Sequence, residues 1–215
     1  VGIFAYQGGI SQGAGTEAAP RESAGSESAP LDMSRRTADD PTALGPVDAP
    51  VVLVEYADYR CPFCGLFSRD TLPPLVEKYV KSGELRVEWR DLPVFGEQST
   101  MAAVAGRAAG NQGKFWEFNK AVFAIAPERG HADLSRERLV QIAREAGVPD
   151  VTQFEADLNS TELQQAVATD AQEAASLGAT GTPTFLVNDT PLVGAQPLAT
   201  FEKAIQAALK KAESQ

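Results

Sequence analysis

The sequence of 215 residues predicts an α/β fold that is interrupted by a block of helices. A short apolar run at residues 51–57, typical of a buried strand, leads directly into a helical pattern that opens with two cysteines. Helical spacing then continues from about residue 98 to residue 177, with no strand pattern in between. A strand pattern returns at residues 184–187. This order places an all-α insertion inside an α/β unit.

The composition excludes several classes of protein. The formal net charge is −10, from 19 Lys and Arg against 29 Asp and Glu, whereas phosphate backbones and anionic lipids attract basic surfaces. We therefore expect no nucleic-acid partner. Two cysteines are too few for a disulfide-dense scaffold, and the single histidine, His131, falls in a polar loop where we expect it to be solvated. With so few metal-binding side chains, we expect no metal and no cofactor.

The N-terminal segment differs from the rest of the chain. Residues 1–6 are apolar apart from a tyrosine hydroxyl, and they are too few to span a bilayer, which takes about 20 residues. They fit either the outer end of a signal peptide or membrane anchor, or an ordinary tail. Residues 8–32 are rich in Gly, Ser, Ala and Pro, which is typical of flexible linkers. We expect residues 1–40 to be a membrane-proximal, flexible tether of an extracytoplasmic protein, and the globular part to begin near Pro41.

The first part of the α/β domain contains two strands and one helix. After the strand at 51–57, apolar residues recur at helical spacing from residue 65 to residue 81. Pro73 and Pro74 predict a break or kink in this helix, because proline has no N–H to donate. The alternating segment at 85–89 predicts a second strand.

The predicted helical insertion covers residues 97–178 and contains about four helices. Serines at three predicted N-termini supply oxygen atoms that accept hydrogen bonds from the first turn. They are Ser99, Ser135 and Ser160. The aromatic segment 115–123 predicts a further amphipathic helix, and Gly147 and Gly178 follow the last apolar residues of two helices.

The chain returns to α/β structure after residue 178. A strand at 184–187, a turn at residues 188–189 and a short strand at 192–193 predict a hairpin. Pro197 then opens a final amphipathic helix. The α/β domain is thus divided into two parts, residues 41–96 and 179–215.

Cys61 and Cys64 are spaced C-x-x-C, a pattern with three interpretations. Zinc requires four ligands, so a zinc site would have to be shared between two chains. A structural disulfide at this spacing closes a very small loop and stabilises little. A redox-active pair is typical of the position between a buried strand and a helix. We favour the redox pair because these cysteines occupy that position.

The local chemistry of the pair depends on the start of the helix. Cys61 falls at the predicted N-cap and Pro62 at the first helical position, where a missing N–H costs nothing. The free N–H groups of the first turn and the helix dipole favour a thiolate at Cys61. Such sites lower a cysteine pKa from about 8.5 to roughly 3.5–7.5, which makes the disulfide more oxidising. Cys64, one turn later and facing inward, is the expected resolving thiol.

A second candidate feature is Thr182-Pro183, directly before the strand at 184–187. A trans proline at a strand start is common. In a chain that also has a C-x-x-C helix we favour a cis bond, which would turn the Thr182 backbone outward beside the cysteines. Its N–H and C=O groups would then be free to pair with an extended substrate peptide.

These features together resemble DsbA-like thiol-disulfide oxidoreductases. The resemblance rests on the strand VVLVEYADY followed by CPFC, the helical block, the segment GTPTF and the terminal helix, and it covers about residues 41–212. The segment FWEFNKAVF also resembles the aromatic helix of the family's insertion. The resemblance implies a thioredoxin-like fold with an all-α insertion between the second strand and the cis-proline strand. It also implies that Cys61 attacks, Cys64 resolves, and Thr182 and Pro183 bind substrate.

The resemblance bears on two further positions. Glu55 matches a buried acid thought to assist proton transfer with the resolving thiol, although an ordinary acid on a strand face is the alternative. Strongly oxidising members often have His between the cysteines, where this sequence has Phe63. We therefore expect the pKa of Cys61 to be lowered, but not to the bottom of the range. We also expect Pro62 and Phe63 to contribute an apolar, substrate-binding lip.

The implied function is an extracytoplasmic oxidase that introduces disulfides into secreted clients. The expected partners are unfolded secreted proteins with cysteine pairs and a membrane redox partner that reoxidises the enzyme, and we expect a monomer. A reductase or isomerase of the same fold is the main alternative, although isomerases usually carry a dimerisation domain and none is visible. A chaperone-like binding module with an incidental C-x-x-C is a third possibility.

Overall fold

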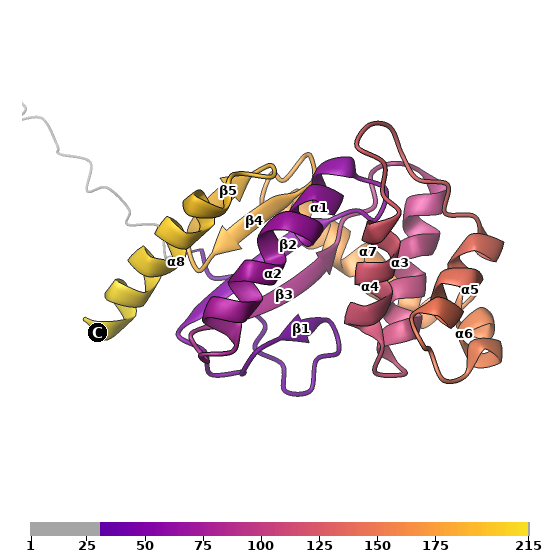
Figure 1. Ribbon diagram of the computed structural model, residues 1–215, viewed down its shortest axis with the longest axis horizontal. Coiled ribbons are helices and arrows are strands. Elements are labelled where there is room, and N and C mark those ends of the chain that lie inside the picture. Colours follow the sequence, from indigo (N-terminus) through magenta and orange to yellow (C-terminus); the bar gives the residue numbers. More distant parts are fainter. Residues whose placement is uncertain (1–30, 215) are drawn as a thin grey trace, which may run out of the picture.

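A five-stranded mixed sheet forms the centre of the structure, a computed structural model that describes residues 31–214 (Figure 1). The strands lie in the order β1-β3-β2-β4-β5, with β2 and β3 parallel and the other neighbours antiparallel. Their bounds are Ala43–Leu44 (β1), Val51–Ala57 (β2), Leu85–Asp91 (β3), Thr184–Val187 (β4) and Thr190–Val193 (β5). The helical insertion lies between β3 and β4, as the sequence predicts, whereas the two-residue β1 is too short to show a periodic pattern.

The helix after β2 continues past Pro73 and Pro74 but changes its winding. In chain order it consists of α1 (Pro62–Leu66), a π-helical segment (Phe67–Thr71), α2 (Leu72–Leu75) and a second π-helical segment (Val76–Val80). The prolines remove two backbone donors, and the neighbouring turns use hydrogen bonds between residues five apart, such as Lys81 N–H to the Val76 carbonyl. The predicted break is therefore a local widening of a continuous helix.

The insertion contains five helices where the sequence predicted about four: α3 (Glu97–Gly110), α4 (Phe115–Ala124), α5 (Arg136–Glu145), α6 (Val151–Asp157) and α7 (Thr161–Ser176). α6 has seven residues with one buried side chain, Phe154, so it shows no repeating apolar pattern. Ser135 and Ser160 are N-caps, as predicted. The prediction for Ser99 is wrong. The positive φ of Gly96 (87°) lets α3 begin earlier, and Ser99 is buried in its first turn.

Helices cover both faces of the sheet. The α1–α2 helix and α8 (Leu198–Glu213) lie on one face, and α7 lies on the other (Figure 1). On the first face, the Phe67 ring packs against Phe185 of β4 and Phe201 of α8, with ring centroids 4.5 and 5.1 Å away. A second aromatic core joins the sheet to the insertion and includes Tyr59, Trp89, Phe115, Phe118 and Phe123. The segment that carries the cysteines and the helix that follows it thus pack into both cores.

The other face of β3 is charged, although it is buried. The side chains of Arg86, Glu88 and Arg90 are at most 5% exposed. The Glu88 carboxylate accepts hydrogen bonds from four groups: the side chains of Arg86 and Arg90 and the backbone N–H groups of Arg35 and Arg36. Residues before Pro41, such as Arg35 and Arg36, therefore pack against the sheet. The division into a tether, an α/β domain and an insertion stays a prediction.

Among residues 31–214, no helix is both long and apolar enough to cross a membrane. The apolar residues 1–6 and nearly all of the linker at 8–32 lie outside the described residues. The sequence-based expectations for this N-terminal segment therefore stay predictions.

Candidate active site

The two cysteines lie where β2 leads into α1. Cys61 is the N-cap residue of α1, with φ −76° and ψ 120°, and Pro62 occupies the first helical position. Cys64 follows one turn later, and both cysteines are buried free thiols. The structure therefore has the helix start that the sequence predicts.

The surroundings shift the two thiol pKa values in opposite directions. A hydrogen bond from the Cys64 thiol, followed by one from Thr182 and by the backbone N–H groups of Cys64 and Phe63, lowers the pKa of Cys61 to about 6, although burial opposes this shift. Burial raises the pKa of Cys64 well above its ordinary value, and the neighbouring Cys61 raises it further. At neutral pH, Cys61 is therefore mainly a thiolate and Cys64 a thiol.

Glu55 lies on the face of β2 that the α1–α2 helix covers, paired with Trp89 of β3 and Phe185 of β4. The residue is 1% exposed, and its Oε1 atom has no hydrogen-bond partner among residues 31–214. Burial, followed by the negative charge of Cys61, raises the pKa of Glu55 to about 8. Glu55 is therefore mainly a neutral carboxylic acid at neutral pH, unlike a solvated acid on an open strand face.

The Thr182–Pro183 peptide bond is cis and lies beside Cys61. When Cys61 is protonated, its thiol donates to the Thr182 carbonyl oxygen, which lies 3.3 Å from Sγ. The sequence predicted that the N–H and C=O groups of Thr182 are both free to bind a peptide. In this structure the C=O group instead accepts a hydrogen bond from the Cys61 thiol. The Pro183 carbonyl oxygen accepts a hydrogen bond from Gly194 N–H at 2.8 Å, which ties this loop to the end of β5.

Apolar side chains are exposed near both halves of the site. Phe63 is 60% exposed and Leu66 is 41% exposed, both on α1. Val193 on β5 is 68% exposed and pairs with Thr184, directly after the cis peptide. The predicted exposure of Phe63 is confirmed, and α1 and the end of β5 both present apolar surface.

Three polar residues near the cysteines are not identified by the sequence. Asp58 is buried, and Arg60 donates through its guanidinium group to the carbonyl oxygens of Phe95 and Ala132. His131 is exposed, as expected, but its Nδ1 atom lies 2.9 Å from the Arg60 carbonyl oxygen. Asp58 and Arg60 could have been suspected from the sequence, because they lie within three residues of Cys61. Nothing in the sequence connects His131 to that segment.

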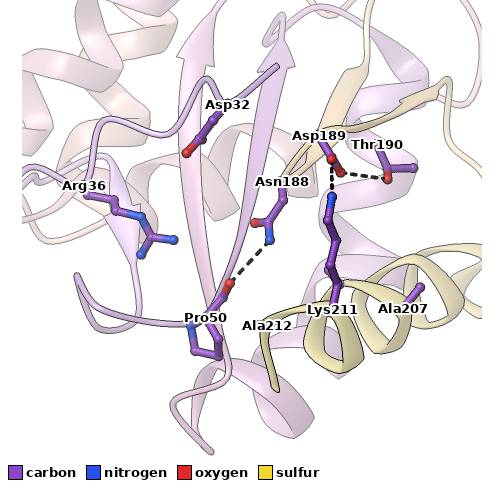
Figure 2. Close-up of a pocket in the computed structure, with 10 residues that line it drawn as sticks. Asp32, Arg36, Pro50, Asn188, Asp189, Thr190, Ala207, Lys211 and Ala212 are labelled. Carbon is purple, nitrogen blue, oxygen red and sulfur yellow. Dashed lines mark hydrogen bonds and ion pairs between the residues drawn. The ribbon is translucent and has the colours of Figure 1, made fainter. Parts of the chain in front are cut away.

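Among residues 31–214, no group of three or more His, Cys, Asp or Glu side chains is placed to hold a metal ion. A cavity of about 450 Å³ lies at the opposite end of β2 from the cysteines, between the β4–β5 turn and α8 (Figure 2). In it, Lys211 pairs with Asp189 at 2.7 Å, and Asn188 donates to the Pro50 carbonyl oxygen at 3.4 Å. The predicted site residues do not line this cavity, so we do not assign the thiol chemistry to it.

This chain is similar to known proteins over most of its length. The chain matches the thioredoxin family over residues 37–207. It is 32% identical over 173 residues to the probable disulfide bond formation protein D of Bacillus anthracis, covering 79% of this chain and 78% of that protein. A thioredoxin-like oxidoreductase from Silicibacter pomeroyi DSS-3 is 32% identical, with a TM-score of 0.68 over 78% of this chain and 91% of that chain. For alpha-DsbA1 from Wolbachia pipientis, the identity is 28% and the TM-score 0.71, over 80% of this chain and 92% of that chain.

The matched structures confirm the predicted thioredoxin-like α/β fold with its helical insertion, because they cover both parts of the molecule. The chain therefore belongs to the thioredoxin family, as a DsbA-like thiol-disulfide oxidoreductase.

Proposed function

We propose that this chain is an oxidase that introduces disulfide bonds into client proteins. The reaction starts from the enzyme with a Cys61–Cys64 disulfide. A client thiolate attacks Sγ of Cys61, which forms a mixed disulfide and releases Cys64 as a thiolate. The client's second thiolate then attacks the client sulfur of the mixed disulfide, and Cys61 leaves as a thiolate. Two electrons pass from the client to the pair. The client thiols release their two protons to solvent, and Cys64 takes up one proton.

The observation that carries this proposal is the opposite shift of the two thiol pKa values. With a pKa of about 6, the Cys61 thiolate is a good leaving group from the mixed disulfide. A stabilised thiolate also stabilises the reduced enzyme, which favours transfer of the disulfide to the client. Cys64 is buried and its pKa is raised, which suits the internal partner of the pair rather than the group that meets clients.

We further propose that Glu55 supplies the proton that Cys64 needs when it leaves the disulfide. Burial keeps the Glu55 carboxyl group neutral at neutral pH, since its pKa is raised to about 8. A thiolate at Cys64 would be costly in this apolar interior. Proton transfer from Glu55 moves the charge away from the sulfur, and solvent restores the proton later.

Client binding is proposed to use the backbone and apolar contacts. Phe63, with Pro62 beside it, presents apolar surface next to Cys61. Once Cys61 is in a disulfide, its thiol no longer donates to the Thr182 carbonyl group, so that group beside Pro183 is available to a client N–H. Contacts of this kind tolerate many sequences, which suits unfolded secreted proteins with cysteine pairs.

The proposed location is outside the cytoplasm, because disulfides persist in oxidising compartments. We propose that a membrane redox partner reoxidises the enzyme, that residues 1–40 tether it to the membrane, and that it acts as a monomer. The name of the Bacillus anthracis relative, a disulfide bond formation protein, supports the oxidising direction.

Two other functions use part of the same site. A reductase or isomerase would pass electrons to its clients, and the lowered pKa of Cys61 favours the oxidase over it. A chaperone-like binding module would use the exposed Phe63 and Leu66 without any need for the opposite shifts of the two thiol pKa values.

Reduction potential and cysteine substitutions test the proposal. Equilibration with glutathione should give a potential nearer to about −120 mV, as in a strong oxidant, than to about −270 mV, as in thioredoxin. Cys61→Ser should abolish oxidation of a reduced, unfolded client. In Cys64→Ser, oxidised glutathione should first convert Cys61 to a mixed disulfide with glutathione, and exchange with a client thiol should then accumulate a client mixed disulfide through Cys61 and release glutathione. A potential near −270 mV would replace the oxidase with a reductase. Unchanged client oxidation by Cys61→Ser would contradict the proposed chemistry.

A further inference from the structure

The loop between α4 and α5, residues 125–135, contacts the chain on both sides of the cysteine pair. After the pair, Gly65 is packed so closely that a Cβ atom at this position would lie 2.9 Å from the Ala126 Cβ atom. Before the pair, the Arg60 side chain donates to the Ala132 carbonyl oxygen at 2.9 Å. Figure 1 shows this loop at the same end of the molecule as α1. An element remote in sequence therefore brackets the redox pair.

His131, the only histidine in the chain, makes a third contact of this loop. Its Nδ1 atom lies 2.9 Å from the Arg60 carbonyl oxygen. Because a carbonyl oxygen only accepts, Nδ1 carries the proton and donates. The imidazole ring lies against Phe95, with ring centroids 4.2 Å apart and ring planes 34° apart. The acceptor of this hydrogen bond therefore belongs to the peptide group that joins Arg60 to Cys61.

The same peptide group is also held through its N–H. Cys61 N–H donates to the Asp58 carbonyl oxygen at 3.0 Å. The buried Asp58 carboxylate accepts from the backbone N–H groups of Val94 at 2.7 Å and Phe95 at 3.2 Å. The Phe95 carbonyl oxygen in turn accepts from the Arg60 guanidinium group at 2.7 Å. These hydrogen bonds surround the Arg60–Cys61 peptide and connect it to the two neighbouring loops.

We propose that His131 is a positioning residue for Cys61: by donating to the Arg60 carbonyl oxygen, it fixes the peptide that sets the direction of the Cys61 side chain. The orientation of this peptide contributes to the extended backbone of Cys61 at the N-cap. That backbone determines how Sγ faces the free N–H groups of the first turn, which stabilise a thiolate. The inference rests on the proposed role of Cys61 as the attacking thiol.

Two substitutions separate the hydrogen bond from the ring contact. His131→Phe keeps a ring against Phe95 but has no donor, whereas His131→Asn places an amide N–H near the position of Nδ1. With His131→Phe, the equilibrium with glutathione should shift toward the Cys61–Cys64 disulfide by roughly twofold to tenfold, as expected for one lost hydrogen bond. His131→Asn should recover most of this loss. Glu128→Gln, an exposed position of the same loop, is the matched control and should behave like the unaltered protein.

The glutathione equilibrium distinguishes positioning from a purely structural role. A structural role would lower the denaturation midpoints of the oxidised and reduced forms equally and leave this equilibrium unchanged, which would overturn the proposal. Failure of His131→Asn to improve on His131→Phe would also overturn it. Client oxidation, measured on the same samples, tests the proposed oxidase function separately from the role of His131. If the unaltered protein does not oxidise clients, the oxidase function is wrong, while the glutathione equilibrium still tests whether His131 positions Cys61.

Discussion

The Sγ atom of Cys61 lies 3.3 Å from the carbonyl oxygen of Thr182, although 121 positions separate the two residues. Antiparallel pairing of β2 with β4 produces this contact, because Tyr56 near the end of β2 lies opposite Thr184 at the start of β4. The segment that leaves β2 and the loop that enters β4 therefore meet at the same edge of the sheet. The helical insertion separates them in sequence without separating them in space.

Replacing Phe63 tests how the residue between the cysteines affects the pKa of Cys61. The thiolate absorbance of the unaltered protein should titrate with a pKa of about 6. Phe63→His should lower this pKa by roughly one unit, because an imidazolium at the first helical turn adds a positive charge beside the sulfur. Phe63→Tyr retains an aromatic ring without that charge and is the control. Identical titrations of the His and Tyr variants would show that charge at this position is unimportant.

Glu55 should make the reduced protein less stable as the pH rises. Its pKa is about 8 in the folded state, above its ordinary value of 4.5, so between these two values the folded chain holds a proton that the unfolded chain has lost. The free energy of unfolding should therefore fall with increasing pH across this window, by up to several kcal/mol. Glu55→Gln keeps the shape but does not titrate, so its pH profile should lack this fall. Parallel profiles of urea denaturation for the two proteins would contradict the assignment.

Glu88 should be essential for stability, since it lies between two buried arginines. Burial raises its pKa, but hydrogen bonds from the Arg35 backbone and from the side chains of Arg86 and Arg90 outweigh burial and lower it to about 2. Glu88→Gln leaves Arg86 without its counter-charge and Arg90 with only its pair to Glu173 at 3.3 Å, and it should cost about 3–5 kcal/mol in denaturant unfolding. The stability that Glu88 contributes should be lost as the pH falls from about 4.5 toward 2, and the variant should lack this loss.

An exposed ion pair provides the comparison for Glu88. Glu77 pairs with Lys81 at 2.5 Å, with side chains 71% and 63% exposed. Glu77→Gln should therefore change the unfolding free energy by less than about 1 kcal/mol. A similar cost for the substitutions at Glu77 and Glu88 would show that burial of the Glu88 cluster is not what matters.

Gly65→Ala should disturb the contact between α1 and the α4–α5 loop. The new methyl group would lie 2.9 Å from both the Ala126 Cβ atom and an Arg69 guanidinium nitrogen, which is closer than real Cβ contacts. The expected loss is about 1–3 kcal/mol in thermal or denaturant unfolding. Ala126→Gly in the same chain should restore part of it. Gly181→Ala, where a Cβ atom meets nothing within 4 Å, should be nearly neutral, and an equal loss there would refute the packing argument.

The parts of the site that follow from local sequence were predictable. A β-branched run, a proline after Cys61 and serine caps act over a few residues, so the strand, the helix start and the caps at Ser135 and Ser160 agree with the structure. Ser99 was misjudged because a glycine with positive φ let the helix begin earlier. The alternating pattern of β3 identifies a strand, but it does not show that α7 and the segment around Arg35 cover its charged face.

Local sequence patterns account for the order of the main elements and for the position of Cys61 and Cys64 at a helix start, because propensity, capping and apolar periodicity act over a few residues. Packing between distant segments buries Glu55 near Cys61, places the Thr182 carbonyl oxygen against the Cys61 thiol, and brings His131 to the Arg60 carbonyl oxygen. Each of these contacts joins segments that are distant in the chain. Burial and hydrogen-bond partners of that kind depend on which elements pack together, and a linear pattern does not contain that information.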